Sequence, residues 1–138
     1  MNKVRELSNS PIKASSIIGT NVVNPDGEML GDVKEIVIDP RTGRVAYAVV
    51  SFGGFLGMGT KLFAIPFSAL KYNVTKSEFA NNEYIIPSEH IQSEYVLDIS
   101  KERLEKAPGF DIDHWPLMSD EKWHRDMHRY YERLPYWE

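Results

Sequence analysis

The chain has 138 residues, of which 42% are apolar and 26% are charged, as in an ordinary globular domain that buries a core. It contains no cysteine, which excludes disulfides, thiolate metal sites and cysteine nucleophiles. Its apolar runs fall short of the roughly 18 to 20 residues that a membrane-spanning helix needs, and residues 1–11 lack the apolar core of a signal peptide. We therefore expect a cytoplasmic protein without a transmembrane segment.

The formal net charge of −4 is unevenly distributed along the chain. Residues 1–72 hold eight Lys or Arg and six Asp or Glu, whereas residues 73–138 hold eight and fourteen. No block of basic residues is present. Proteins that bind nucleic acid through its phosphates concentrate positive charge on one face, so direct DNA binding is not expected.

Short β-like runs dominate the first half of the chain after a polar tail, which we expect to be flexible over residues 1–14. The runs lie at residues 17–23, 33–38, 45–52 and 61–70. Turn-forming residues separate the first three, at 24–27 (Asn-Pro-Asp-Gly) and 39–43 (Asp-Pro-Arg-Thr-Gly), with Asp39 read as a turn residue. Strands joined by such short turns favour an antiparallel meander.

Two of these runs carry additional information. The run at 45–52 (VAYAVVSF) is apolar at both alternating sets of positions, which predicts a strand covered on both faces. The run at 61–70 contains Pro66, which predicts an edge strand or a bulge because proline cannot donate a ladder hydrogen bond.

The second half is expected to be loop, strand and then helix. Residues 73–83 are polar and predict a loop or hairpin tip, and residues 94–99 predict a further strand. Ser100 is a good N-cap for a helix that places Leu104 and Ala107 inward and ends at the Pro-Gly pair at 108–109. Ser119 or Asp120 would cap a last helix. Its predicted apolar stripe comprises Trp123, Met127, Tyr130 and Leu134, before Pro135 stops it.

A glycine-rich stretch at 54–61 reads G-x-x-x-x-G-T-K, a near match to the P-loop pattern G-x-x-x-x-G-K-[ST]. The final Lys and Thr are transposed, and the residues after Lys61 do not predict the helix whose N-terminus would hold a phosphate. We therefore expect a connection between two antiparallel strands. Phe55, Leu56 and Met58 within it would either plug the end of a barrel or form a contact surface.

The histidines suggest a metal site and an acid–base site, and each set of residues could instead have a purely structural role. His124 and His128 have the i, i+4 spacing of a two-histidine metal site, and Asp120 and Glu132 extend the row. The same residues would also serve as the solvated flank of a helix. His114, between Asp111 and Asp113, could support acid–base chemistry or anchor a loop by packing. We expect no catalytic residues, no cofactor and no metal.

Ten of the sixteen aromatic residues follow residue 72, and several crowd the C-terminus. Aromatics without interleaved basic residues fit helix docking or a protein interface better than base stacking. The interface candidates from the sequence are Phe55, Leu56, Met58, Tyr131, Tyr136 and Trp137.

Residues 15–116 resemble the PRC-barrel family, which includes the cytoplasmic domain of the H subunit of photosynthetic reaction centres and the C-terminal domain of a ribosome maturation factor. The residues that carry the resemblance are Ile18-Gly19, Gly31-Asp32-Val33, the turn at 39–44, Ile65-Pro66 and Leu70, and residues 98–116 look like the tail of stand-alone bacterial members. The resemblance implies a mainly β fold, a small and highly twisted antiparallel barrel at 15–99. A helical extension at 100–138 would pack on or beside it.

A shared fold does not by itself carry a function, so neither of these family roles is transferred to this chain. The theme that the resemblance implies is a barrel that serves as a protein-binding module. We expect a non-enzymatic protein-binding or assembly module that forms a homodimer and binds a protein of unknown identity. Three alternatives remain open: a ribosome- or RNA-associated accessory factor, a protein linked to photosynthetic electron transfer, and a small metal-dependent enzyme.

Overall fold

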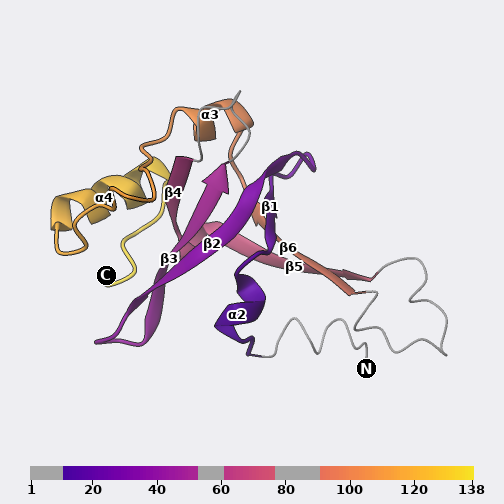
Figure 1. Cartoon of the computed structure of the whole chain (residues 1–138), viewed down its shortest axis with the longest axis horizontal. Coiled ribbons are helices and arrows are strands. Elements are labelled where there is room, and N and C mark those ends of the chain that lie inside the picture. The colour runs from indigo at the N-terminus through magenta and orange to yellow at the C-terminus, as the bar shows by residue number, and fades with distance from the viewer. Residues whose placement is uncertain (1–10, 53–60, 77–90) are drawn as a thin grey trace.

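The computed structural model describes residues 11–52, 61–76 and 91–138, which form a mainly β domain with C-terminal helices (Figure 1). The strands are β1 (Asn21–Val23), β2 (Met29–Asp39), β3 (Arg44–Phe52), β4 (Lys61–Pro66), β5 (Leu70–Lys76) and β6 (Ile91–Leu97). The helices are α2 (Ala14–Ile17), the 3-10 turn η1 (Phe67–Ala69), α3 (Lys101–Glu105) and α4 (Glu121–Tyr130). No helix in the described part of the chain has the length and hydropathy to cross a bilayer.

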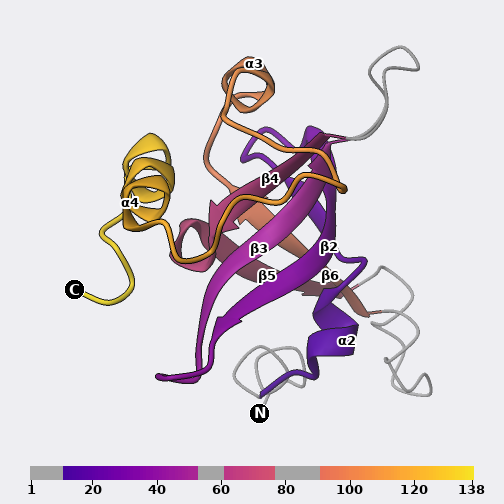
Figure 2. The ribbon, with the colours of Figure 1, turned by 60° about the vertical axis from the view of Figure 1, so that its left-hand side comes forward.

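The six strands form one sheet in the order β4-β3-β2-β1-β6-β5. All neighbours are antiparallel except β1 and β6, which run parallel with Val22 opposite Tyr95. The antiparallel arrangement expected from the sequence holds for the other four neighbouring pairs of described strands, and the β1–β6 pair departs from it because β6, which is antiparallel to β5, runs in the direction of β1. Among the described strands, β4 and β5 are the two ends of the sheet. The sheet is strongly twisted, and β5 and β6 cross behind β2 and β3 (Figures 1 and 2).

Strand β3 is buried on both faces, as its sequence predicts. Ala48 and Val50 belong to the main core cluster, which also includes Phe63 of β4 and Leu104 of α3. On the other face, Tyr47 lies in a second cluster with Ala46, Ala64 and Met127 of α4. Figure 2 shows α4 beside the β3–β4 end of the sheet, which explains the cover on that face.

The expected first strand is too long. Residues 17–20 are not part of it, since α2 occupies Ala14–Ile17 and β1 begins only at Asn21. Gly19 takes a positive φ of 95°, which breaks the extended backbone, and its N–H donates to the Val33 carbonyl at 2.7 Å. The start of the sheet is thus set by a glycine rather than by the β-branched residues before it.

The expected loop at 73–83 is wrong for its first four residues. Strand β5 continues to Lys76 and pairs with β6, with Asn73 opposite Glu94. Pairing with a neighbouring strand outweighs the low β-propensity of polar residues. The prediction for Pro66 is confirmed, because it is the last residue of β4, an edge strand among those described.

Both predicted helix starts are confirmed by their caps. The Ser100 side chain accepts from the Arg103 N–H at 3.1 Å, and Asp120 accepts from the Trp123 N–H at 3.3 Å. The stripe predicted to reach Leu134 is wrong at its end, since α4 stops at Tyr130 and Leu134 is 80% exposed. The reason is the backbone of Glu132, whose φ of 58° turns the chain out of the helix.

Candidate functional site

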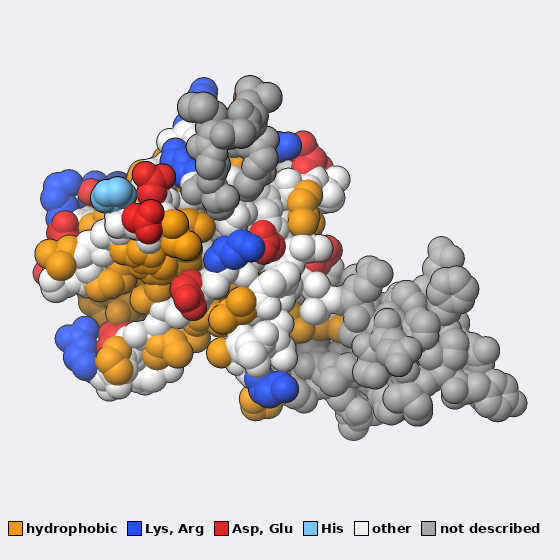
Figure 3. Space-filling model, in the orientation of Figure 1, with side chains coloured by type: hydrophobic (Ala, Val, Ile, Leu, Met, Phe, Trp, Pro, Cys, Tyr) orange, Lys and Arg blue, Asp and Glu red, His pale blue; other side chains and the backbone are white. Residues whose placement is uncertain are grey.

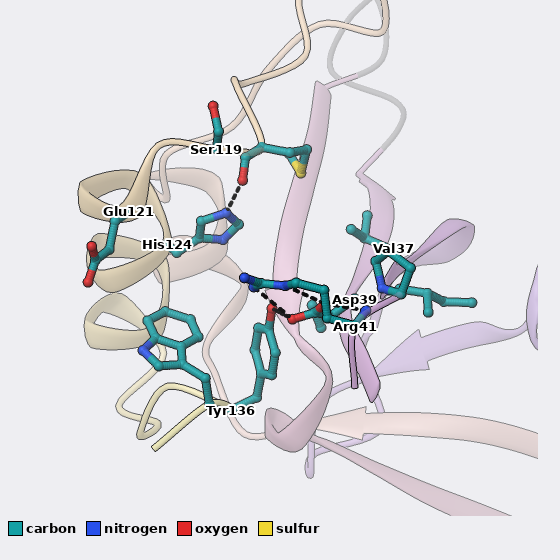
Figure 4. Close-up of a pocket in the computed structure, with 12 residues that line it drawn as sticks. Val37, Asp39, Arg41, Ser119, Glu121, His124 and Tyr136 are labelled. Carbon is teal, nitrogen blue, oxygen red and sulfur yellow. Dashed lines mark hydrogen bonds and ion pairs between the residues drawn. The ribbon is translucent and has the colours of Figure 1, made fainter. Parts of the chain in front are cut away.

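A groove of about 780 Å³ lies between the β2–β3 turn on one side and α4 with the C-terminal segment on the other. Figure 4 shows the side chains that face it from both walls. Its apolar lining comprises Val37, Ile38, Pro40, Ala46, Met118 and Trp137, and its polar lining comprises Asp39, Arg41, Ser119, Glu121, His124 and Tyr136.

Asp39 joins the turn to the C-terminal segment. Its side chain is only 5% exposed, and its Oδ1 accepts from the Arg41 backbone N–H at 3.0 Å and from Nε at 3.2 Å. Its Oδ2 accepts from the Tyr136 hydroxyl at 2.8 Å (Figure 4). These bonds, first those of Arg41 and then that of Tyr136, lower the pKa of Asp39 to about 2. The turn role predicted for Asp39 is confirmed, whereas its bond to Tyr136 has no sequence signal.

His124 lies on the helix side of the groove with both ring nitrogens engaged. Nε2 is 2.6 Å from the Met118 carbonyl, which can only accept, so Nε2 carries the proton. Nδ1 is 2.6 Å from the Tyr47 hydroxyl and therefore accepts from it in the neutral ring. Tyr47 was not predicted as a site residue, because its position inside an apolar run identifies it only as a core residue.

His128 is buried behind His124, with 1% of its surface exposed. Its Nδ1 donates to the His124 carbonyl at 2.7 Å, and its Nε2 has no hydrogen-bond partner among the described residues. A protonated ring would bury a second, unpaired N–H. Burial accordingly lowers the pKa of His128 from its usual 6.5.

Exposed apolar side chains surround this groove and continue beyond it. A second hollow of about 530 Å³ is lined by Lys34, Glu35, Val49, Leu62, Ile112 and Trp115. We define the apolar face as the exposed large residues that line the two hollows, together with Leu117, which adjoins Met118 in the chain. Its members are Ile38, Ile112, Trp115, Leu117, Met118 and Trp137, with exposures from 37% to 72%. Figure 3 shows apolar side chains gathered on the α4 side of the molecule, with both acidic and basic side chains at their border.

The PRC-barrel domain model matches residues 11–89, more than half of the chain. The chain belongs to the PRC-barrel family. A comparison with curated proteins found no match. The match covers the strands that form one wall of the groove, while α4 and residues 110–138, which form the other wall, lie outside it.

The metal row suggested by the sequence is not assembled in this PRC-barrel chain. Asp120 caps α4, Glu132 lies exposed beyond the end of α4, and both nitrogens of His124 already have partners. Of the two histidines in this row, His128 is the one with a nitrogen that lacks a partner among the described residues, and this Nε2 is buried. Within the described ranges, no three His, Asp or Glu side chains are grouped as metal ligands would be.

The structure also shows where the acid–base candidate around His114 lies and where the P-loop-like segment ends. His114, Asp111 and Asp113 are all exposed, and the neighbouring Trp115 packs its ring on Phe110 at a centroid distance of 5.0 Å. The aromatic ring therefore anchors this segment by packing. In the segment at 54–61 that resembles a P-loop, Lys61 is the one residue that the structure describes, and it begins β4 rather than a helix.

The interface candidates from the sequence divide into three groups. Phe55, Leu56 and Met58 lie outside the described residues. Tyr131 is 8% exposed and belongs to the main core, so it does not present its ring to a partner. Tyr136 is half-buried through its bond to Asp39, and Trp137 is 37% exposed at the rim of the groove. The larger apolar members at 112–118 were missed, although four bulky apolar residues in a short loop are a signal that could have found them.

Proposed function

We propose that this PRC-barrel chain is a non-enzymatic protein-binding and assembly module of the bacterial cytoplasm that binds through the apolar face. The observation that carries the proposal is the gathering of exposed Ile, Leu, Met and Trp side chains around two adjoining hollows. Contiguous apolar surface is costly to keep in water, and on soluble domains it marks contact sites. Large aromatic and methionine side chains are also the types enriched in protein interfaces.

The non-enzymatic part of the proposal is supported by how the polar groups of the groove are used. The Asp39 carboxylate accepts from Arg41 and Tyr136, and both ring nitrogens of His124 are bonded. A general base or acid needs a free position that faces the substrate. These groups instead join β2 and β3 to α4 and the C-terminal segment.

The alternatives receive less support. A direct RNA contact is disfavoured because residues 111–121 along the face hold four carboxylates and no Lys or Arg. A metal-dependent enzyme would require ligands that the described histidines do not bring together. A link to photosynthetic electron transfer rests on the family resemblance alone.

Site-specific photo-crosslinking in the source organism tests the proposal. A photoreactive amino acid at Leu117, which is 72% exposed on the face, should give discrete products with protein partners. The matched control is Leu134, which is 80% exposed and lies outside both hollows. Equal products from both positions, or none from Leu117, would show that the face is not a protein-binding site.

The homodimer expected from the sequence remains a prediction, and light scattering over a concentration series tests it. A mass that rises to twice that of the chain, and that falls back in an Ile112→Ser/Leu117→Ser variant, would make the second copy the partner. Because both side chains are at least 70% exposed, the substitutions should leave stability within about 0.5 kcal/mol of the parent.

A further inference from the structure

We propose that the occupant of the apolar face is a basic segment of a different protein, in which apolar side chains alternate with Lys or Arg. This inference rests on the proposed protein-binding function and specifies the chemistry of the partner. It follows from the shape of the two hollows and from the charges along their border.

The two hollows follow one another along the same strand. Lys34 and Glu35 of β2 border the second hollow, and Val37 and Ile38 of β2 border the groove. The opposite border is also continuous in sequence, with Ile112 and Trp115 at the second hollow and Met118 at the groove. Three residues of a strand span roughly 10 Å, so one extended segment of a few residues is long enough to reach both hollows.

The border formed by residues 111–121 is acidic. Its charged side chains are Asp111, Asp113, Asp120 and Glu121, and all four are exposed. Glu121 pairs with Arg125 at 2.9 Å and Asp120 caps α4, but Asp111 and Asp113 form no ion pair with any described residue. Two carboxylates at this border thus have no cation partner in the part of the chain that the structure describes.

The residues of β2 along the opposite border provide little free positive charge to balance these carboxylates. Lys34 pairs with Asp32 at 3.0 Å, and Arg41 pairs with Asp39 at 3.2 Å. Glu35, which lines the second hollow, is exposed and has no ion pair with the described residues. Two cations near the face, Arg44 and Lys61, also have no ion pair with a described residue, and they donate to the Tyr136 and Ala107 carbonyls. The carboxylates of the border without an ion pair to a described residue include Asp111, Asp113 and Glu35, so the balance of unpaired charge is negative.

This sign selects among possible occupants. A second copy that used the same face would bring acidic border against acidic border, because a two-fold contact pairs a surface with itself. An anionic membrane or a nucleic acid would be repelled in the same way. A cationic polypeptide would gain charge complementarity at the border and bury its apolar side chains in the hollows.

Fluorescence anisotropy with labelled synthetic peptides tests this inference on the full chain. The probes are four peptides of equal length: Leu alternating with Lys, the same with Glu for Lys, the same with Gln for Lys, and Lys alternating with Ser. We expect the Leu–Lys peptide to bind most tightly, and less tightly at high salt. The Lys–Ser peptide should bind much more weakly, because it has no apolar side chains.

The chain variant Asp111→Asn/Asp113→Asn removes the uncompensated border charges. It should weaken binding of the Leu–Lys peptide about 2- to 10-fold, the range that two exposed ion pairs account for. Asp26→Asn is the matched control, since Asp26 is an exposed carboxylate in the β1–β2 turn, away from the face. It should leave the affinity unchanged.

Three results would overturn the inference, and two of them would leave the proposed function standing. Equal or tighter binding of the Leu–Glu or Leu–Gln peptide would show docking without the expected charge. A homodimer abolished by Ile112→Ser/Leu117→Ser would make a second copy the occupant. Equal binding of the Lys–Ser peptide would reduce the interaction to charge alone and would count against the apolar face as a docking site.

Discussion

Asp39 shows how one residue links distant parts of this chain. Its carboxylate closes the β2–β3 turn through Arg41 and holds the C-terminal segment through Tyr136, 97 residues later in the sequence. The Arg44 guanidinium, from the start of β3, donates to the Tyr136 carbonyl and adds a second contact at the same place. The side of the groove that carries Trp137 is therefore held to the β2–β3 turn by Asp39 and Arg44, and to α4 by Arg125, which pairs with Glu138 and lies over the Trp137 ring.

Asp39→Asn should lower stability near neutral pH and flatten its dependence on acid. The folded-state pKa of about 2 lies below the usual 3.8, so the folded chain binds this proton less readily than the unfolded chain. The stabilising contribution is present above about pH 4 and is lost as the pH falls toward 2. Urea unfolding monitored across this range measures the effect.

The control for this prediction is Asp98→Asn, which changes an exposed carboxylate that has no ion pair with the described residues. It should retain the acid dependence of the parent. An Asp39→Asn variant that loses stability in acid as steeply as the parent would contradict the role assigned to Asp39.

At the scale of elements, α4 docks on the sheet through His124 and His128, which both pack against Tyr47. The Tyr47 ring lies 5.5 Å from the ring of His124 and 5.4 Å from that of His128, measured between centroids. The other groups that face His128 are Tyr136 at 6.0 Å and Trp137 at 5.4 Å. No carboxylate is among these ring contacts, so nothing there compensates a proton on His128.

His128→Leu should reduce the loss of stability between about pH 7 and about pH 5. Because burial lowers the folded-state pKa of His128 below 6.5, its contribution is fully present above that pH. Below pH 6.5 the unfolded chain binds a proton at this histidine more readily than the folded chain, so stability falls. The contribution is fully lost once the pH has fallen through the lowered folded-state pKa. Leucine does not titrate, so this part of the pH dependence should disappear.

Hydrogen exchange of the α4 and β3 amides, measured at both pH values, provides a second measurement. In the parent, protection of both elements should fall together with acid, because the sheet and α4 are expected to unfold as one unit. His114→Gln is the control because His114 is exposed, and it should change neither measurement. If the His128→Leu variant kept the full acid dependence, the titration would have to be assigned to another group.

At the scale of the whole molecule, two apolar clusters lie on opposite faces of β3. The main cluster fills the space between the strands and α3, and the second holds α4 against Tyr47 and Ala64. Since β3 contributes to both, we expect the sheet and α4 to unfold together.

Met127→Ala should lower the free energy of unfolding of the whole domain by about 2 to 5 kcal/mol, the usual cost of a cavity at a buried methionine. Met127 is 3% exposed in the second cluster. All three tryptophans follow residue 110, so their fluorescence reports the C-terminal part, whereas far-ultraviolet circular dichroism reports the whole fold.

Both signals should shift together to lower urea concentration in this variant. The exposed Met118→Ala provides a control with the same chemical change, and it should have little effect on stability. A fluorescence transition that moves alone would show that α4 unfolds separately from the sheet.

The sequence pattern alone predicted those structural features that are determined by residues within one strand, helix or turn. The strand at 45–52, the caps Ser100 and Asp120, the edge position of Pro66 and the turn role of Asp39 could all be predicted. In each case the deciding interaction lies within a few residues, such as a cap bond three positions away, or in the side-chain alternation of a strand. The mainly β fold followed from the same local patterns, whereas the PRC-barrel family was recognised from the resemblance of residues 15–116 to known members.

Tertiary structure decided the features that depend on residues far apart in sequence. The parallel pairing of β1 with β6, the bond from Tyr47 to His124 across 77 positions, and the bond from Tyr136 to Asp39 leave no local pattern. The same holds for the apolar face, which forms only when the 110–118 segment lies along β2 and β3. The periodicity of apolar residues indicates which side of a strand or helix is buried. It does not indicate which other strand or helix packs on that side, because this depends on tertiary contacts.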